Sequence, residues 1–412
     1  MTKVVVGDGG SVIVAAALSD ERADHALLEG LASQTTLPDG TPALPLDAGS
    51  LFSGSHLRVW MLDLEPATLR DANVEVSGIE PIDPLPAPGG VHVVAVSAGA
   101  TGSGKTALTR RMARGLRRSG VRTVVLRHPT PNRLLWPDLP LVEVIRERDD
   151  IGTARPFEER EELTPVIGTG VAVVVGVDPV AMLDAAGAEA GPGGVIVWDG
   201  GGAARPWVRP DLHVVVVDPI RPLPEVLPER VASADAVVIT KADSAPRDAT
   251  IAAEQEVRAW NAHAQVILAD MPVAVPRSAD LVDRRVVLVE DYPSVVRGEL
   301  RGGAGAVAAK RFRCGVVDPR PSAVGAIAAV LASGRLGPVI PSLGRTPEEI
   351  EDLRASIAAT PGDVVLWGST ATPEGICDPA QRPVIGAFPE LMEVAGGSIG
   401  DVMRPLLPGG GA

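Results

Sequence analysis

The stretch VHVVAVSAGATGSGKT, from Val91 to Thr106, decides the fold of this chain. VHVVAVS is a continuous apolar run, typical of a strand buried on both faces of a parallel sheet. The segment after it matches the phosphate-binding pattern GxxxxGK[ST] at every fixed position, and a helix-like stretch follows directly. Glycines let backbone N–H groups turn inward around phosphate oxygens, and the helix N-terminus adds its positive dipole end. The sequence therefore predicts a nucleotide site made by Gly99, Thr101, Gly102, Ser103, Gly104, Lys105, Thr106 and Ala107.

Two side chains of this loop have predicted chemical roles. Lys105 is expected to bridge the β- and γ-phosphates and to act in catalysis, and the Thr106 hydroxyl is expected to bind Mg²⁺. Asp199 ends the buried run GVIVWD, where a second magnesium ligand with a catalytic role is expected in such proteins. Asp178, which ends VAVVVGVD, is the weaker alternative for this position.

A second loop bears on the choice of nucleotide. Thr240-Lys241-Ala242-Asp243 is a variant of the [NT]KxD base-recognition pattern and follows an apolar run. In that pattern the carboxylate accepts hydrogen bonds from guanine, and the lysine stem packs on the ring. Adenine offers no such pair of donors, so Asp243 favours GTP, while ATP stays open. Lys241 and Asp243 are thus predicted to bind the nucleotide.

Further apolar runs alternate with helix-like stretches, which predicts a doubly wound, mostly parallel α/β sheet of the P-loop NTPase class. The runs are VRTVVLR, VAVVVGV, GGVIVWD, LHVVVVD, ADAVVIT and AQVILAD. We predict a P-loop domain over residues 91–284, preceded by a Pro-rich linker at 85–90. A small N-terminal α/β domain is expected over 1–84, and a C-terminal α/β domain over 285–405. In the latter, Thr346 is expected to cap a helix that begins at Pro347.

Composition limits the class of protein. The 412 residues carry a net charge of −14, which argues against nucleic acid as a partner. No run of about 18 uncharged apolar residues occurs, so no membrane partner is expected. Cys314 and Cys377 lack metal-ligand spacing and are expected to be reduced thiols, which favours a cytoplasmic location. Only four of the 38 basic residues are lysines, and Lys105 and Lys241 are two of them.

Longer stretches of the chain are similar to one family. They run from about residue 91 to 400 and include LRHPTPNRLL, FEEREELTPVI, RPDLHVVVVDPIRP, LVEDYPSVVRGELRGGAGAVAAK and GPVIPSLGRTPEEIEDL. Together with the P-loop and VVITKAD, they resemble the predicted GTPases related to cyclic 2,3-diphosphoglycerate synthetase. The resemblance implies ATP-driven closure of an intramolecular phosphoanhydride, in which one substrate phosphate is activated by phosphoryl transfer and its neighbour then attacks it.

The chain departs from that family at positions that the resemblance assigns to the substrate. Relatives usually carry Gly-Pro-Thr and His where this chain has Tyr292, Ser294 and Arg297. They carry an Arg and a Tyr where this chain has Ala387 and Pro389. We therefore expect a related reaction on a different substrate.

Several charged residues at predicted strand ends are candidates for the substrate side. Arg127 and His128 end the strand after the P-loop helix, at the sheet edge where ligands bind. Arg127 would clamp an anion, and His128 would transfer a proton. The acidic run 158–162 has two interpretations. It forms a solvated helix face, or one of its acids, Glu159 or Glu162, positions water or a second metal. Further candidates in the last block are Glu290, Asp291, Arg297, Arg301, Asp318 and Arg320.

These observations predict an NTP- and Mg²⁺-dependent enzyme that transfers a phosphoryl group to an acidic small molecule, with a homo-oligomer possible. The alternative is a GTPase switch or metallochaperone that acts through a protein partner. A third option is a regulator that binds nucleotide without turnover.

Overall fold

The computed structural model describes residues 84–128, 136, 138–201, 204–297 and 300–407, together with short strands near the N-terminus. Those strands are β1 (Thr2–Val6), β2 (Ser11–Ala16), β3 (Trp60–Asp63) and β4 (Glu75–Val76), in the order β3-β2-β1-β4. The rest of the predicted N-terminal domain lies outside the described residues. The predicted domain of residues 1–84 therefore stays a prediction.

A nine-stranded sheet forms the centre of the molecule, in the order β20-β12-β11-β10-β5-β9-β6-β8-β7. Its seven inner strands are parallel, as the apolar runs predicted, and they confirm the P-loop type of α/β fold. They are β5 (His92–Ala98), β6 (Thr123–Arg127), β8 (Ala172–Gly176), β9 (Val195–Asp199), β10 (Leu212–Val217), β11 (Ala236–Ile239) and β12 (Gln265–Asp270). The edge strands β7 (Val142–Ile145) and β20 (Met392–Ala395) are antiparallel to their neighbours.

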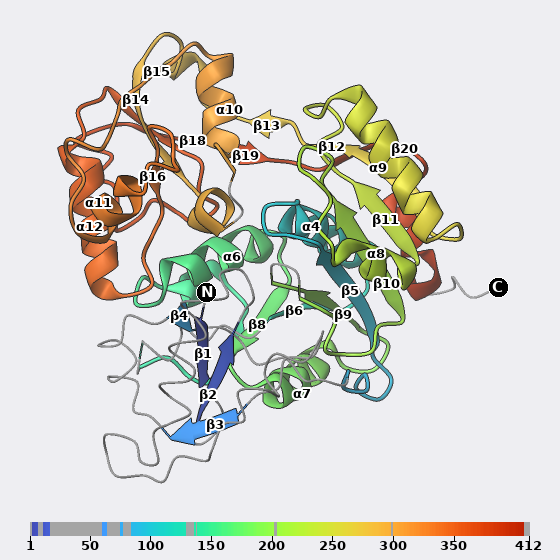
Figure 1. The fold of residues 1–412 in the computed structure, drawn as a ribbon. Helices are drawn as coiled ribbons and strands as arrows, with labels where there is room; N and C mark the ends of the chain where they lie inside the picture. The colour runs from blue at the N-terminus through green and yellow to red at the C-terminus, as the bar shows by residue number, and fades with distance from the viewer. Residues whose placement is uncertain are drawn as a thin grey trace.

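Helices cover both faces of this sheet because side chains alternate along each strand. On β5, Val94 and Val96 pack with α4 (Lys105–Arg118), α6 (Phe157–Ile167) and α13 (Ile399–Val402). Val93 and Ala95 face the opposite side, where α7 (Pro179–Ala190) packs. Farther along that side lie α8 (Leu227–Ala232) and α9 (Arg247–Trp260). The result is a three-layer P-loop unit (Figure 1).

A five-stranded parallel sheet forms a second core, which we call the C-terminal unit. Its strands are β14 (Arg285–Glu290), β15 (Gly315–Val316), β16 (Ile340–Pro341), β17 (Val364–Trp367) and β18 (Val384–Gly386). Its helices are α10 (Ala304–Arg311), α11 (Gly325–Ala332) and α12 (Pro347–Ala359). Thr346 caps α12, since its side chain accepts a hydrogen bond from the Glu349 amide, which confirms that prediction.

The end of the chain returns from the C-terminal unit to the P-loop unit. Strand β19 (Phe388–Pro389) pairs with β13 (Val273–Ala274), and β20 then joins the edge of the large sheet beside β12 (Figure 1). Leu391, Ile399 and Leu406 lie in the core between this sheet and α4. The boundary predicted for residues 285–405 stays a prediction, but its last segment packs in the P-loop unit.

The predicted linker at residues 85–90 is anchored at its start. The Leu85 amide donates to the Trp207 carbonyl at 2.8 Å, and the Leu85 carbonyl accepts from the Arg209 amide at 2.8 Å. Leu85 and Ala87 also pack against the core under α7. None of the helices within the described ranges has the length and apolar character that crossing a bilayer requires.

Helix α6 joins the two units. The Phe157 ring belongs to the core of the C-terminal unit and meets Trp367 edge-to-face, with ring centroids 6.0 Å apart. The Phe157 amide donates to the Gly344 carbonyl at 2.6 Å. At the other end of α6, Leu163 and Val166 belong to the core of the P-loop unit. One helix is therefore part of both hydrophobic cores.

Candidate functional site

The P-loop lies between β5 and α4, as predicted. Gly102 and Gly104 have positive φ values of 78° and 105°, a conformation that only glycine adopts without strain. A Cβ atom on Gly104 would also come within 2.9 Å of the Met271 sulfur. Within the loop, the Ser103 hydroxyl and the Lys105 amine donate to the Ala100 carbonyl at 2.9 and 3.2 Å.

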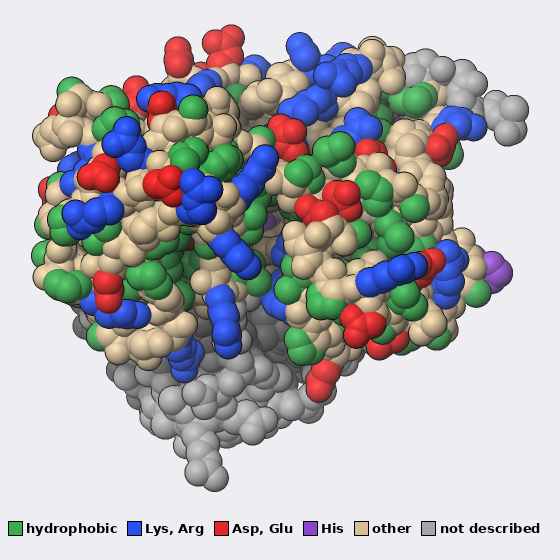
Figure 2. Space-filling view, turned by 90° about the horizontal axis from the view of Figure 1, so that it is seen from above, with side chains coloured by type: hydrophobic (Ala, Val, Ile, Leu, Met, Phe, Trp, Pro, Cys, Tyr) green, Lys and Arg blue, Asp and Glu red, His purple; other side chains and the backbone are tan. Residues whose placement is uncertain are grey.

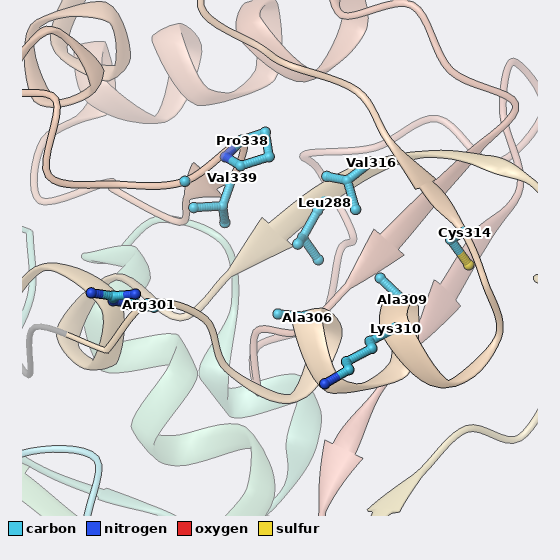
Figure 3. A pocket seen from close by; sticks show the side chains of 10 residues that line it. Leu288, Arg301, Ala306, Ala309, Lys310, Cys314, Val316, Pro338 and Val339 are labelled. Carbon is cyan, nitrogen blue, oxygen red and sulfur yellow. The ribbon is translucent and has the colours of Figure 1, made fainter. Parts of the chain in front are cut away.

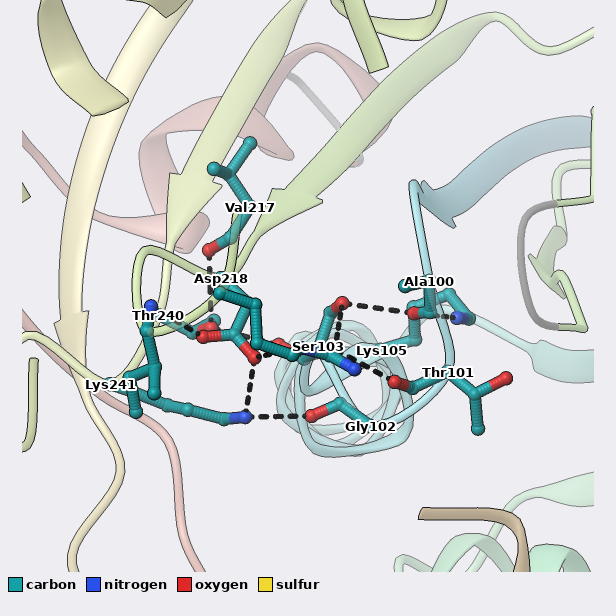
Figure 4. Close-up of polar contacts among 11 residues, drawn as sticks. Ala100, Thr101, Gly102, Ser103, Lys105, Val217, Asp218, Thr240 and Lys241 are labelled. Carbon is teal, nitrogen blue, oxygen red and sulfur yellow. Dashed lines mark hydrogen bonds and ion pairs between the residues drawn. The ribbon is translucent and has the colours of Figure 1, made fainter. Parts of the chain in front are cut away.

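The predicted base-recognition loop, residues 240–243, contacts the P-loop directly (Figure 4). The Thr240 hydroxyl donates to the Ser103 carbonyl at 2.8 Å, and the Lys241 amine donates to the Gly102 carbonyl at 2.8 Å. Lys241 has a positive φ of 57°, unusual for a residue with a side chain. These contacts bring together two motifs that lie far apart in the sequence.

Asp218, which directly follows β10, binds two of the basic side chains that contact the P-loop. Its Oδ2 lies 2.7 Å from the Lys241 amine and 3.3 Å from the Arg221 Nε. The Arg221 Nη2 in turn donates to the Thr101 carbonyl at 2.8 Å. Arg221 is thus a further cation at the P-loop, beside Lys105 and Lys241. The sequence signal for Asp218 was present, since LHVVVVD ends in an acid as GVIVWD does, but our sequence analysis overlooked it.

Arg127 and Asp199 face each other at the ends of neighbouring strands, because β6 and β9 pair in parallel with these residues in register. The Arg127 Nη1 forms an ion pair with Oδ2 of Asp199, and both residues are buried, at 3% and 0% exposure. The Arg127 Nη2 lies 2.8 Å from Oε1 of Glu162 on α6. The His128 Nε2 lies 3.2 Å from the same Glu162 oxygen.

The predicted residues Lys105, Asp199, Arg127 and His128 are therefore brought into one charged group. Burial lowers the pKa of Lys105 to about 8, against the attraction of the nearby Asp199 carboxylate. Burial alone would raise the pKa of Glu162, but the Arg127 cation and the adjacent His128 hold it well below its usual range. The group combines two carboxylates with buried cations at the P-loop.

The residues present fit a magnesium ion. Oδ1 of Asp199 is buried and finds no hydrogen-bond partner within the described part of the chain. An orphaned carboxylate oxygen is costly in a protein interior, and a hard divalent cation is a suitable partner for it. Thr106 lies half-buried in the first turn of α4, directly after Lys105. One carboxylate, one hydroxyl and nucleotide phosphates form an oxygen donor set of the kind that Mg²⁺ prefers.

The alternative magnesium ligand, Asp178, has a structural role. It is the N-cap of α7, and its Oδ1 accepts from the Val180 and Ala181 amides at 2.9 and 3.1 Å. This carboxylate satisfies the N–H groups at the start of that helix. These contacts favour a structural role for Asp178, whereas Asp199 is the carboxylate close enough to Lys105 to influence its charge.

The acidic run on α6 is not a solvated helix face, since residues 158–161 are buried. Glu159 is 0% exposed, and its Oε1 accepts from the Arg155 Nη1 at 3.1 Å. Glu162, weighed as the alternative to Glu159, is the carboxylate that joins Arg127 and His128. The catalytic role of Glu159 stays a prediction.

Glu161 and Asp291 lie close together between the two units, with Glu161 buried and Asp291 half-buried. Ser342 and Ser369, both in the C-terminal unit, donate to Oε1 of Glu161, the latter at 2.6 Å. Asp291 follows β14 and accepts from the Ser294 hydroxyl at 2.6 Å. Burial raises the pKa of Glu161 well above its usual range, and the adjacent Asp291 adds to this effect. Burial likewise raises the pKa of Asp291. Sequence analysis missed Glu161, Ser342 and Ser369.

The C-terminal unit also reaches the P-loop. A Cβ atom on Gly102 would lie 3.0 Å from Cδ1 of Leu300 and 3.5 Å from the Ser294 hydroxyl. Ser294 is one of the positions at which the chain departs from the family pattern. Figure 2 shows Lys and Arg side chains gathered along the hollow between the two lobes of the molecule. An anionic ligand is the kind of molecule that such a hollow attracts.

The other predicted substrate residues of the C-terminal unit have different surroundings. Oε1 of Glu290 accepts from the Gly303 and Ala306 amides at 2.9 and 2.6 Å and so holds the N-terminus of α10. Burial raises the pKa of Glu290 to about 7. Asp318 and Arg320 pair with each other at the surface. The side chain of Arg297 lies outside the described residues.

Asp243 is exposed in the loop after β11, and its Oδ1 accepts from the Met271 amide at 3.0 Å. Met271 is also the residue that lies against Gly104 of the P-loop. Asp243 is thus close to the phosphate loop, and its selectivity for guanine stays a prediction.

Comparisons with known proteins place these features in context. No protein-family model matches the chain. Arginine synthetase ArcE of Thermococcus kodakarensis is 33% identical over 321 residues, which are 76% of this chain and 70% of the relative. LpxK of Aquifex aeolicus, solved with ATP, superposes with a TM-score of 0.46 at 14% identity, over 83% of this chain and 94% of that one. The hydrogenase maturation factor HypB of Archaeoglobus fulgidus superposes with a TM-score of 0.30 at 16% identity, over 50% and 86%.

Proposed function

The chain belongs to the family of arginine synthetase ArcE, and from this premise we propose that it is a magnesium-dependent P-loop synthetase. The γ-phosphoryl group of a nucleoside triphosphate passes to an oxygen of an acidic acceptor. A second nucleophile, or a neighbouring group of the same acceptor, then displaces the phosphate. The observation that supports this proposal is the orphaned oxygen of Asp199 in the same charged group as Lys105.

The chain's own residues supply binding and charge. The P-loop amides and Lys105 hold the β- and γ-phosphates, and Arg221 adds a cation at the loop. Mg²⁺, when bound, would be held by Thr106 and Asp199 and would neutralise phosphate charge. Arg127, fixed by Glu162, holds the Asp199 carboxylate in place. In such a site catalysis comes from positioning and electrostatic stabilisation.

The acceptor is proposed to lie in the hollow between the units, because the P-loop there faces Ser294 and Leu300. Basic side chains along the hollow favour a carboxylated or phosphorylated molecule (Figure 2). The name of the relative says that it synthesises arginine, which carries a carboxylate. The resemblance to cyclic 2,3-diphosphoglycerate synthetase instead implies a phosphorylated acid that closes on itself. Both acceptor types belong to the proposed class.

Turnover with a panel of acids tests the proposal. The protein would be incubated with Mg²⁺, ATP or GTP, and amino acids or phosphorylated acids, and products followed by ³¹P NMR. A synthetase also works in reverse, so arginine with nucleoside diphosphate and phosphate is a second assay. Acceptor-dependent phosphate release that is lost in Asp199→Asn supports the proposal. Acceptor-independent turnover at an equal rate across the whole panel contradicts it.

The second candidate is a GTPase switch or metallochaperone, which acts through a protein partner. The contacts of Thr240 and Lys241 with the P-loop favour it, since they join a base-recognition motif to the phosphate site. This alternative predicts slow GTP hydrolysis that no small acid accelerates and that a protein partner does. A homo-oligomer stays possible under either candidate.

A further inference from the structure

A cavity of about 240 Å³ lies in the C-terminal unit between α10 and the edge of β14 (Figure 3). Ala306 and Ala309 of α10 form one wall, and Leu288 lies in the middle of the floor. Val316 and Val339 close the opposite side. The walls are therefore mainly aliphatic.

The cavity exists because two short strands share one edge of β14. Strand β15 pairs with Arg285 and Val286, and β16 pairs with Val289 and Glu290. Leu288 lies between the two pairings, where neither strand covers it. The residues of α10 above this gap are alanines, whose side chains are too small to fill it. The gap is thus built into the topology of the sheet.

Two cations stand at the rim of this cavity, Arg301 and Lys310. Both are exposed, and the Lys310 amine extends along α10 toward the end where Arg301 lies (Figure 3). Neither side chain forms an ion pair with any residue that the structure describes. Elsewhere in the same unit exposed arginines do find carboxylates, as Arg313 with Asp283 and Arg320 with Asp318. Lys310 is also one of only four lysines in the chain.

We propose that this cavity is a binding site for a small organic anion, a carboxylate or phosphate on a short aliphatic body. Apolar walls favour burial of the aliphatic body, and the two rim cations attract the acid group. The volume lies below the roughly 300–1,000 Å³ of pockets for drug-sized ligands, which restricts the body to a few carbons. The site lies beyond the proposed function, since it requires neither nucleotide nor turnover.

Calorimetric titration of the full chain with butyrate and butyl phosphate tests this site directly. Butylammonium has a body of the same length and the opposite charge, so it is the matched control ligand. Saturable binding of the anions is expected at millimolar concentration, with no binding of butylammonium. The double variant Arg301→Met/Lys310→Met should bind the anions about tenfold more weakly, because two cation contacts are lost. Arg284→Met removes an exposed charge of the same unit and should leave binding unchanged.

Cys314 lines the cavity, so the rate at which its thiol is alkylated shows whether the cavity is occupied. Burial raises the pKa of both thiols, but only that of Cys377 rises far, to about 12, so Cys314 is expected to react first with iodoacetamide. Bound butyrate should slow alkylation of Cys314, and the cavity-filling variant Ala306→Leu should remove both this protection and the binding. The proposal is overturned if the wild-type protein shows no saturable anion binding. It is also overturned if butylammonium binds equally well, or if the double variant retains full affinity.

Discussion

Glu161 and Glu162 are neighbours on α6, yet their carboxyl groups face different units and have pKa values shifted in opposite directions. Glu161 points to Ser342 and Ser369 of the C-terminal unit, and burial raises its pKa. Glu162 points to the P-loop side, where the Arg127 cation and the adjacent His128 outweigh burial and lower its pKa. Two adjacent residues of α6 thus connect the contact between the units with Arg127, which in turn pairs with Asp199.

Glu161→Gln should flatten the dependence of stability on pH. A carboxyl group with a raised folded-state pKa binds more protons in the native than in the unfolded state. The free energy of unfolding therefore falls as pH rises from the unfolded pKa through the folded one, by about 1.4 kcal/mol per pKa unit. The neutral amide would remove this loss. Urea denaturation of both proteins between about pH 5 and pH 9 measures it, with the exposed Glu351→Gln as control. Parallel curves for wild type and Glu161→Gln would contradict this account.

Glu162→Gln should have the opposite effect. The ionised Glu162 stabilises the fold above its unfolded pKa, and this contribution is lost as pH falls through the lower folded value. At neutral pH the variant leaves Arg127 with one of its two carboxylates, at a cost of about 3 kcal/mol. Denaturation at neutral pH measures this loss, and Glu161→Gln is the matched neighbouring variant. Equal stability of the two variants at neutral pH would show that the Arg127–Glu162 contact does not contribute to the free energy of unfolding.

Nucleotide affinity should fall above about pH 8. Burial lowers the pKa of Lys105 to about 8, so the free protein loses this ammonium at moderately alkaline pH. Binding of phosphate then requires uptake of a proton, and affinity falls about tenfold per pH unit. Lys105→Ala should remove this dependence and lower turnover on the order of 10²–10³-fold, while circular dichroism stays unchanged. Arg258→Ala, on the exposed face of α9, is the control. Full turnover in Lys105→Ala would disprove the site.

Asp243→Asn should weaken GTP more than ATP. The carboxylate accepts from two donors that guanine has and adenine lacks, so its loss costs on the order of 10- to 100-fold in GTP affinity. Thermal shifts with both nucleotides, converted to dissociation constants, measure this change. Unchanged GTP affinity would remove the base-recognition role from Asp243 and favour ATP as the co-substrate.

Gly104→Ala should abolish nucleotide binding. A methyl group there meets the Met271 sulfur at 2.9 Å, and the positive φ of 105° adds backbone strain. Gly193→Ala is the matched control, because Gly193 also has a positive φ, 72°, with open space around its Cβ position. Gly193→Ala should lose about 1 kcal/mol of stability through backbone strain and Gly104→Ala at least as much, but only Gly104→Ala should lose the nucleotide. Equal nucleotide binding in the two variants would mean that the loop tolerates a larger residue.

Much of the fold could be predicted because buried parallel strands leave a local pattern. Each predicted apolar run of the large sheet is a strand in the structure, namely β5, β6 and β8 to β12. The edge strands β7 and β20 were missed because their sequences, VEVI and MEVA, contain a charged residue and lack a continuous apolar run. The return of the chain to the large sheet was missed for the same reason.

The site was predicted in part. Lys105, Asp199 and Arg127 stand directly at strand or helix ends, so the rule that ligands bind at the carboxyl edge of a sheet brought them together. Asp218 follows β10 in the same way and was overlooked. Arg221 could not be assigned by this rule, and neither could the choice of Glu162 over Glu159, because each depends on a contact with a residue of another element.

The sequence by itself determined the phosphate loop, its flanking strand and helix, and the strand-end acid opposite it. Those features depend on short-range geometry, namely glycine torsions, strand burial and helix direction. Only the tertiary structure decided which acid of the run 158–162 serves the nucleotide site and which the contact between the units. Successive residues of a helix point about 100° apart, so their partners depend on how α6 packs between two cores, and that packing leaves no local pattern in the chain.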